Sequence, residues 1–243
     1  MPAAAQFQQL IEVQVKPGHE IGYENYIKKI KEAADKIGSP VSWSTFYVAV
    51  GKPGSTYRIA LSFDKWADRD AWQGPRQVLV EAFGEQEGTK IYTEGTSHAA
   101  KSSFRIWQVI DDGTANPQAP GAGPAPFYEV TIRWVKPEML AEYQGLLRRF
   151  KSAYEGDEVN ASVTRWVLRF GSGENRTFRR TQPFDKWGDR DKWNAREVIS
   201  KHFGPDAPLL FDRLNAAVWK SEHFVSAYRP DLSRTATSST SSD

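Results

Sequence analysis

Arginines on one predicted strand are the side chains best suited to binding chemistry. Within residues 163–170, Arg165 and Arg169 alternate with valines and share one face, and the aligned face of the first half of the chain carries Trp43 and Tyr47. A guanidinium group that is removed from water needs an anionic or polar partner. Further arginines lie on the neighbouring predicted strands: Arg133, Arg179 and Arg180. The pattern predicts an anion-binding pocket in the second half and a separate aromatic pocket, faced by Trp43 and Tyr47, in the first.

A purely structural role is the alternative for these arginines. In that case they form an internal network of ion pairs, for example with Glu12 or Glu129, or lie exposed at the edge of a sheet. One observation separates the two hypotheses. The pocket requires that Arg165 and Arg169 neither point into solvent nor are fully paired with Asp or Glu.

Histidine and cysteine usage limits the metal chemistry of the chain. The four histidines have no counterparts in the other half: His19, His98, His202 and His223. Neither a His-x-x-x-His spacing nor another recognisable metal triad is present, so we predict no metal site. His202, on the late helix predicted for the second half, is the alternative as an axial ligand of a haem. Because there is no cysteine, thiolate nucleophiles, disulfides and Cys-ligated metals are excluded.

Composition excludes several classes of partner. The 32 basic and 30 acidic residues leave a net charge of +2, which provides no broad field for nucleic acid or an anionic membrane. No apolar run approaches a membrane span, and no P-loop, Gly-x-Ser-x-Gly elbow or dinucleotide fingerprint occurs. Residues 1–6 do not form an intact signal peptide. The expected compartment is the cytoplasm, or the periplasm or exterior if these residues are the stub of a cleaved signal.

A ten-residue segment occurs twice, as FDKWADRDAW at 63–72 and as FDKWGDRDKW at 184–193. Eight of the ten positions are identical, which indicates an internal duplication. We predict that Asp64 caps a helix and that Asp68 and Asp70 lie near its positive end, so that the segment has a structural role. A paired-carboxylate acid–base site is the alternative.

Hydrophobic periodicity predicts the same element order, β-α-β-β-α-β, in both halves. In the first half, strands are expected at 7–15, 43–50, 56–63 and 104–110, helices at 19–37 and 64–83, and a loop or short helix around 89–100. The predicted domains are a first repeat at 7–111, a Gly/Ala/Pro linker at 112–126, a second repeat at 127–230 and a disordered Ser/Thr tail at 231–243.

Both copies of the duplicated segment lie between the third predicted strand and the second long helix. In this placement they resemble the dimeric α+β barrel superfamily in its tandem, single-chain form. The resemblance implies an α+β fold in which two ferredoxin-like repeats pack sheet to sheet as an intramolecular pseudo-dimeric barrel. Burial of the two bare sheet faces, at about 25 cal/mol per Å² of apolar surface, would drive that packing. The resulting molecule is expected to be a monomer or to assemble further into a homo-oligomer.

The superfamily includes cofactor-free monooxygenases of quinone-like aromatics, haem-degrading and haem-using enzymes, and isomerases, so the fold alone does not select a function. The resemblance implies a small-molecule-binding protein. The leading hypothesis is an oxygenase or isomerase that needs no cofactor and acts on an aromatic or anionic metabolite. One alternative is a haem-binding protein. The other is a non-enzymatic structural or interaction module whose cavities are filled by Trp and Phe side chains.

Overall fold

The chain forms two compact units, each a mixed α+β fold with antiparallel strands. The computed structural model describes residues 6–118, 122–158, 161–171 and 175–236. The N-terminal unit comprises residues 6–48, 52–104 and 228–236, and the C-terminal unit comprises residues 49–51 and 105–227. These bounds differ from the predicted repeats at three places, because residues 49–51 and 105–111 belong to the C-terminal unit and residues 228–230 to the N-terminal unit.

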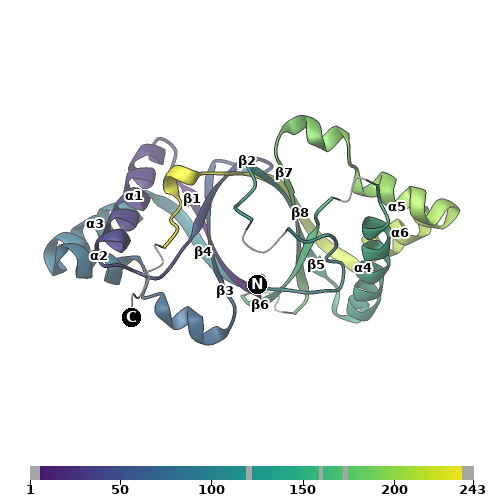
Figure 1. Ribbon diagram of the computed structural model, residues 1–243, viewed down its shortest axis with the longest axis horizontal. Helices are drawn as coiled ribbons and strands as arrows, with labels where there is room; N and C mark the ends of the chain where they lie inside the picture. The colour runs from purple at the N-terminus through teal and green to yellow at the C-terminus, as the bar shows by residue number, and fades with distance from the viewer. Residues whose placement is uncertain (1–5, 119–121, 159–160, 172–174, 237–243) are drawn as a thin grey trace, which may run out of the picture. The chain divides into compact units, whose positions relative to one another are not determined.

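Helices cover one face of the sheet in the N-terminal unit (Figure 1). Its elements are β1 (Phe7–Val15), α1 (Glu20–Lys36), β2 (Ser44–Val50), β3 (Ser55–Phe63), the 3-10 turn η1 (Trp66–Ala71), α2 (Pro75–Phe83), α3 (Glu85–Ser97) and the first part of β4 (Ala99–Val109). Strand β3 pairs antiparallel with both β1 and β2. Alternate residues such as Val13 and Tyr57 pack against Ile27 of α1 and Leu79 of α2 to form the core.

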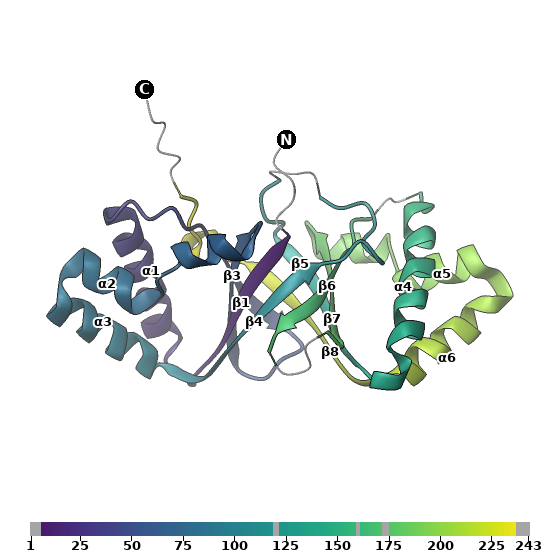
Figure 2. The same ribbon diagram turned by 90° about the horizontal axis from the view of Figure 1, so that it is seen from below.

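Helix α3 was only partly predicted, since a loop or short helix was expected around residues 89–100. The two glycines that weaken the helical pattern are packing positions. A Cβ atom at Gly95 would lie 2.0 Å from the ring of Tyr26, and one at Gly88 would lie 2.6 Å from the backbone of Leu79. The missing side chains therefore let α3 pack closely against α1 and α2, and Figure 2 shows α3 folded back along α2.

The C-terminal unit repeats this order of elements. It contains β5 (Phe127–Val135), the turn η2 (Pro137–Met139), α4 (Leu140–Glu155), β6 (Thr164–Phe170), β7 (Thr177–Phe184), the turn η3 (Trp187–Asp191), α5 (Ala195–Phe203), the turn η4 (Gly204–Asp206), α6 (Ala207–Ala217) and β8 (Val218–Tyr228). The strand order is β8-β5-β7-β6-β4, because residues 106–109 of β4 pair antiparallel with β6. No helix in the described part of the chain is long and apolar enough to cross a membrane.

The prediction of a disordered tail was wrong for residues 231–236. This segment begins within the turn η5 (Pro230–Leu232), and its Arg234 forms a β-bridge with Trp43. Leu232 is fully buried, and the Arg234 guanidinium donates a hydrogen bond of 2.7 Å to Asp35. The Ser/Thr composition suggested disorder, but one buried leucine and one buried arginine are sufficient to attach the segment to the N-terminal unit. Residues 237–243 lie outside the described part of the chain.

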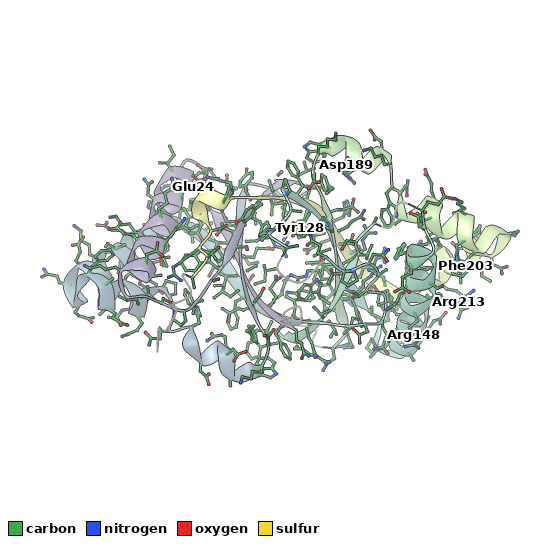
Figure 3. All side chains as sticks on the ribbon, viewed as in Figure 1. Glu24, Tyr128, Arg148, Asp189, Phe203 and Arg213 are labelled. Carbon is green, nitrogen blue, oxygen red and sulfur yellow. The ribbon has the colours of Figure 1, made fainter. Side chains whose placement is uncertain are left out.

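The duplicated segments cap their turns in a way that differs from the prediction. Asp64 was expected to be the capping residue. Instead, Asp68 Oδ2 accepts hydrogen bonds from the backbone N–H groups of Asp64 and Lys65, at 3.2 and 3.0 Å. In the second copy, Asp189 Oδ2 accepts from the N–H of Lys186 at 3.1 Å; Figure 3 labels Asp189 on η3. Both carboxylates thus satisfy backbone donors at the start of a 3-10 turn, which supports a structural role for this position.

Glu24 of α1 contacts the C-terminal segment and makes the stability of the N-terminal unit depend on pH. Glu24, labelled in Figure 3, accepts hydrogen bonds of 2.6 and 2.9 Å from Arg229 and one of 2.7 Å from Tyr57. The hydrogen bonds from Arg229 lower the pKa of the Glu24 carboxyl below its usual 4.5. The folded state therefore binds its proton less readily than the unfolded state. The resulting stabilisation is present above pH 4.5 and is lost as the pH falls through the lowered pKa.

We expect Glu24→Gln to lower the free energy of unfolding by about 1–2 kcal/mol at pH 7, since it removes charge-assisted hydrogen bonds. The difference from the wild type should shrink below pH 4. Urea unfolding between pH 3.5 and 7 measures this directly. Glu32→Gln, which removes an exposed carboxylate that contacts Lys29, is the control and should change stability little. An equal loss at all pH values would contradict the assignment.

Candidate functional site

The candidate site is a cavity of about 700 Å³ in the C-terminal unit, which we call the groove. Its floor is formed by Glu129 of β5 and by Arg180 and Gln182 of β7. Its walls come from the segment that follows β7: Trp187, Gly188, Arg190, Asp191, Trp193, Asn194, Ala195 and Arg196. The volume lies within the usual range for small-molecule sites, and two indole rings beside several polar groups are a common lining.

Strand register explains why the polar floor is continuous. On β7, Arg180 and Gln182 alternate with their neighbours and share a face with Phe178, which belongs to the core beneath the helices. Thr131 lies directly opposite Arg180, and Glu129 lies directly opposite Gln182. The helices cover the Phe178 end of this face, and the polar end borders the groove.

Glu129 holds the two guanidinium groups nearest to it. It pairs with Arg180 through Oε1 and with Arg190 through Oε2, the second contact being 2.8 Å long. The alternative prediction of an ion pair with Glu129 is thus confirmed for Arg180. In the N-terminal unit, Gln9 occupies the position aligned with Glu129 and accepts a hydrogen bond from Arg69, the counterpart of Arg190.

Arg165 is a deeply buried charge at this end of the sheet. It is 2% exposed, and its side chain and that of Leu147 on α4 both lie close to Gly113. Its backbone N–H donates to Thr114 Oγ1 at 2.9 Å, but none of the described residues forms an ion pair with its guanidinium. Burial lowers the pKa of Arg165 to about 10, and the positive charges of Arg180 and Arg133 act in the same direction. The group remains protonated at neutral pH, so a net charge is held in a dry environment.

Several buried donors in this region lack a hydrogen-bond partner among the described residues. They are Arg165 Nε, Arg180 Nε, Tyr143 Oη and Trp193 Nε1. The group is connected, because Tyr143 and Tyr154 both act on the pKa of Arg165, and the Tyr154 ring packs 5.5 Å from that of Trp193. An unsatisfied buried donor costs about 1–3 kcal/mol. Such a concentration of donors is typical of a site that receives acceptor atoms from a ligand.

The structure separates the other predicted arginines. Arg133, half-buried on β5, lies close enough to Arg165 and His223 to lower the pKa of both. Arg169 instead forms hydrogen bonds with Gln108 at 2.6 Å and Asn175 at 2.5 Å, and it does not line the groove. Arg179 lies on the other face of β7, where its guanidinium stacks 4.9 and 4.4 Å from the rings of Trp107 and Trp166. Arg133, Arg165 and Arg180 therefore belong to one cluster, which Arg169 does not join.

The equivalent place in the N-terminal unit is nearly filled, whereas the sequence predicts an aromatic pocket faced by Trp43 and Tyr47 in this half. A cavity of only about 30 Å³ remains, lined by Ile11, Ile27, Ile30, Trp43, Ile59, Leu61, Trp72 and Pro75. That volume has room for about one water molecule. Trp43 is buried in the core with its Nε1 donating 3.0 Å to the carbonyl of Leu232, and Tyr47 packs 5.4 Å from Tyr57. Apolar side chains thus close the first copy of the site.

The histidines form no metal centre. Among the described residues there is no group of three or more metal-ligating side chains. His202 is exposed on α5, with its ring against Phe203, and His19 contacts His98 at 2.9 Å. His223 Nδ1 lies 3.2 Å from Thr131 Oγ1. The described lining of the groove contains no histidine, and its donor set does not fit an iron-bound haem.

Partial desolvation lowers the pKa of the His223 imidazole below its usual value, and the charges of Arg180, Arg190 and Arg133 act in the same direction against the opposing effect of Glu129. This imidazole is therefore neutral at pH 7, and it lies in the same electrostatic neighbourhood as the floor of the groove. In its neutral form the imidazole has one ring nitrogen that can accept a proton.

Sequence reasoning missed the wall of the groove. Trp187, Arg190 and Trp193 belong to the second copy of the duplicated segment, which we interpreted as structural because it occurs in both halves. Two differences between aligned positions of the two halves could have found them. Gln9 of the first half is replaced by Glu129 in the second, and Ile59 on the facing strand is replaced by Arg180. These two differences convert an apolar packing site into a charged one.

No family model matches the chain, and no curated protein matches it by sequence. Solved structures with the same fold do exist. An anthrone oxidase-like protein shares 13% identity with a TM-score of 0.58, covering 96% of this chain and 94% of that chain. A candidate monooxygenase from Lactobacillus acidophilus shares 10% identity with a TM-score of 0.54, covering 96% and 97%. A mutant chlorite dismutase from Candidatus Nitrospira defluvii, solved with cyanide, shares 9% identity with a TM-score of 0.53, covering 95% and 93%.

These proteins belong to the dimeric α+β barrel superfamily, and the similarity extends over nearly the whole chain. At such low identity it establishes the fold only. The mixed α+β architecture implied by the sequence is thereby confirmed. The fold does not select an activity, which depends on the residues of the groove.

Proposed function

We propose that the groove binds a small organic anion with an aromatic body. The observation that carries the proposal is the set of buried donors without partners around Arg165 and Arg180. A carboxylate or phenolate oxygen would satisfy these donors and neutralise the buried guanidinium of Arg165 at the same time. A water molecule would satisfy the donors but would leave the charge uncompensated.

Charge and shape favour the same class of ligand. The cluster contains the guanidinium groups of Arg133, Arg165, Arg180 and Arg190, and within the described part of the chain Glu129 is the one carboxylate that forms an ion pair with any of them. The excess positive charge lies in a partly dry site, where its attraction for an anion is stronger than in water. The indole rings of Trp187 and Trp193 line the same groove and offer flat surfaces for an aromatic ring.

For the reaction, we propose oxygenation without a cofactor of a substrate that ionises to an enolate or phenolate. His223 would accept the proton, and the arginines would stabilise the resulting anion. The electron-rich carbon then reacts with O₂. A methylene group becomes a carbonyl, one oxygen atom is retained, and the other leaves as water with the two substrate hydrogens. The anthrone oxidase-like and candidate monooxygenase neighbours support this class of reaction as an analogy of fold.

Binding is tested with 1-hydroxy-2-naphthoate as the probe, by isothermal titration calorimetry. We expect Arg180→Gln and Arg190→Gln to raise the dissociation constant at least tenfold, because each removes a charged donor from the groove. Arg69→Gln alters the aligned position in the N-terminal unit and is the matched control, with an unchanged dissociation constant. Failure of the wild type to bind, or equal losses in all three variants, would refute the proposed site and favour a non-enzymatic structural module.

The reaction is tested by oxygen uptake with an anthrone as substrate and with no added metal or cofactor. We expect uptake that falls at least tenfold in His223→Gln while probe binding persists. If the substrate exchanges its acidic hydrogen for deuterium without oxygen uptake, the isomerase alternative replaces the oxygenase. Titration with haem tests the haem-binding alternative. A Soret band typical of a ligated iron would favour that alternative, which the groove lining does not fit.

A further inference from the structure

A second cavity, which we call the basic cavity, lies at the other end of β5 and β7. It has a volume of about 360 Å³ and is lined by Arg105, Trp134, Val135, Arg176, Thr177, Trp219 and Lys220. The groove uses Glu129 and Gln182, whereas the basic cavity uses Trp134 and Thr177 of the same two strands. Along β7, three residues of extended strand separate Arg180 of the groove from Thr177 of the basic cavity, or roughly 10 Å at 3.3 Å per residue. The two cavities share no lining residue.

The described residues that line the basic cavity include three cationic side chains and no carboxylate. Within the described part of the chain, neither Arg105 nor Arg176 forms an ion pair. The backbone of Arg176 is fixed, because its carbonyl accepts a hydrogen bond of 2.9 Å from the Val135 N–H. Lys220 contacts Glu222 at 2.9 Å. Two guanidinium groups from separate segments therefore face one cavity with their hydrogen-bonding capacity available.

Two indole rings accompany these cations. Trp219 is 61% exposed, which is unusual for so large an apolar side chain, and the Lys220 ammonium lies 4.3 Å above the ring of Trp134. The aligned positions of the first half carry Ala100 and Gln14, so these tryptophans are not a requirement of the repeated fold. An exposed indole beside unpaired guanidinium groups is a recognition surface for a ring that bears a negative charge.

We propose that the basic cavity binds a planar aromatic carboxylate independently of the groove. The carboxylate would accept paired hydrogen bonds from Arg105 and Arg176, a geometry for which guanidinium is suited. The ring would stack on Trp219, with Lys220 adding long-range attraction. With three cations among its described lining residues and a volume of about 360 Å³, the site matches a small molecule better than a nucleic-acid backbone, which is recognised by an extended row of positive charges.

The test is calorimetric titration of 2-naphthoate into the Arg180→Gln protein, whose groove is weakened, so that the basic cavity is measured separately. We expect one binding site per chain. Introducing Arg105→Gln and Arg176→Gln together into this protein should raise the dissociation constant at least tenfold. Introducing Trp219→Ala should raise it about fivefold. Lys220→Gln should weaken binding, whereas the matched Lys101→Gln, at the aligned position of the first half, should not. Circular dichroism confirms that each variant is folded.

Three outcomes would overturn the proposal: no binding of 2-naphthoate to the Arg180→Gln protein, binding that the double variant leaves unchanged, or displacement of 2-naphthoate by inorganic phosphate or a short oligonucleotide at equal concentration. The last result would indicate a general anion site without aromatic selection. Failure of the proposed groove is recognised separately, because it appears in the titrations of 1-hydroxy-2-naphthoate into the wild type and into the Arg180→Gln and Arg190→Gln variants described above.

Discussion

Deletion of residues 229–243 is expected to lower the free energy of unfolding of the N-terminal unit by about 4 kcal/mol or more. The segment buries Leu232 completely, and loss of a buried leucine alone costs about 2–5 kcal/mol. The backbone of Leu232 also accepts hydrogen bonds from Trp43 Nε1 and Thr45 Oγ1, at 3.0 and 2.9 Å. Both donors would be left inside the unit without a partner.

Hydrogen exchange measures this effect within one unit. The Thr45 N–H donates 2.8 Å to Ser233 Oγ, so its protection should fall strongly in the truncated protein, and that of buried amides in α4 should change little. Deletion of residues 237–243 alone is the matched control and should leave both unchanged. If the longer deletion leaves the protection of β2 at its wild-type level, the segment makes no energetic contribution.

Replacement of Arg165 by methionine is expected to raise stability and to weaken ligand binding in the groove strongly. The guanidinium is buried without an ion pair among the described residues, and an apolar side chain of similar length would remove that cost. Replacing buried charges with apolar residues stabilises proteins by about 1–4 kcal/mol. Loss of a buried charged partner should raise the dissociation constant for 1-hydroxy-2-naphthoate about a hundredfold, or about 2.7 kcal/mol.

This pair of opposite effects distinguishes a binding role from a structural role. Urea unfolding and calorimetry on the same samples provide both quantities. Arg148→Met, which removes an exposed arginine that contacts Asp112, serves as the control and should affect neither. Should Arg165→Met instead lose stability and retain binding, the arginine holds the fold together and the groove does not depend on it.

Much of the fold could be predicted because the order of strands and helices is encoded locally in each half. Alternation placed β1, β2 and β3 within one residue of their observed bounds, and the duplicated segment transferred the same order to the second half. The prediction failed where partners distant in sequence determine the structure. The segment 231–236 is ordered by Trp43 and Thr45, almost two hundred positions away, and no local pattern records that contact.

The candidate site was predicted in part for a similar reason. Face alternation identified Arg133, Arg165 and Arg180 as a group on neighbouring strands, which is a property of the local sequence. It also included Arg169, whose hydrogen bonds to Gln108 and Asn175 depend on the pairing of β4 with β6 and on the following turn. The tryptophans in the wall of the groove were missed because the duplicated segment is nearly identical in both halves. Its sequence does not show that the strand residues beside it differ between the halves.

The path of β4 has a consequence for dissection of the molecule. The strand begins in the N-terminal unit and ends paired with β6, and residues 228–236 return to the N-terminal unit. A cut within residues 112–126 therefore produces two fragments, and each carries a piece that the other fragment needs. Fragments made in this way should remain poorly folded when expressed alone and recover structure when they are mixed.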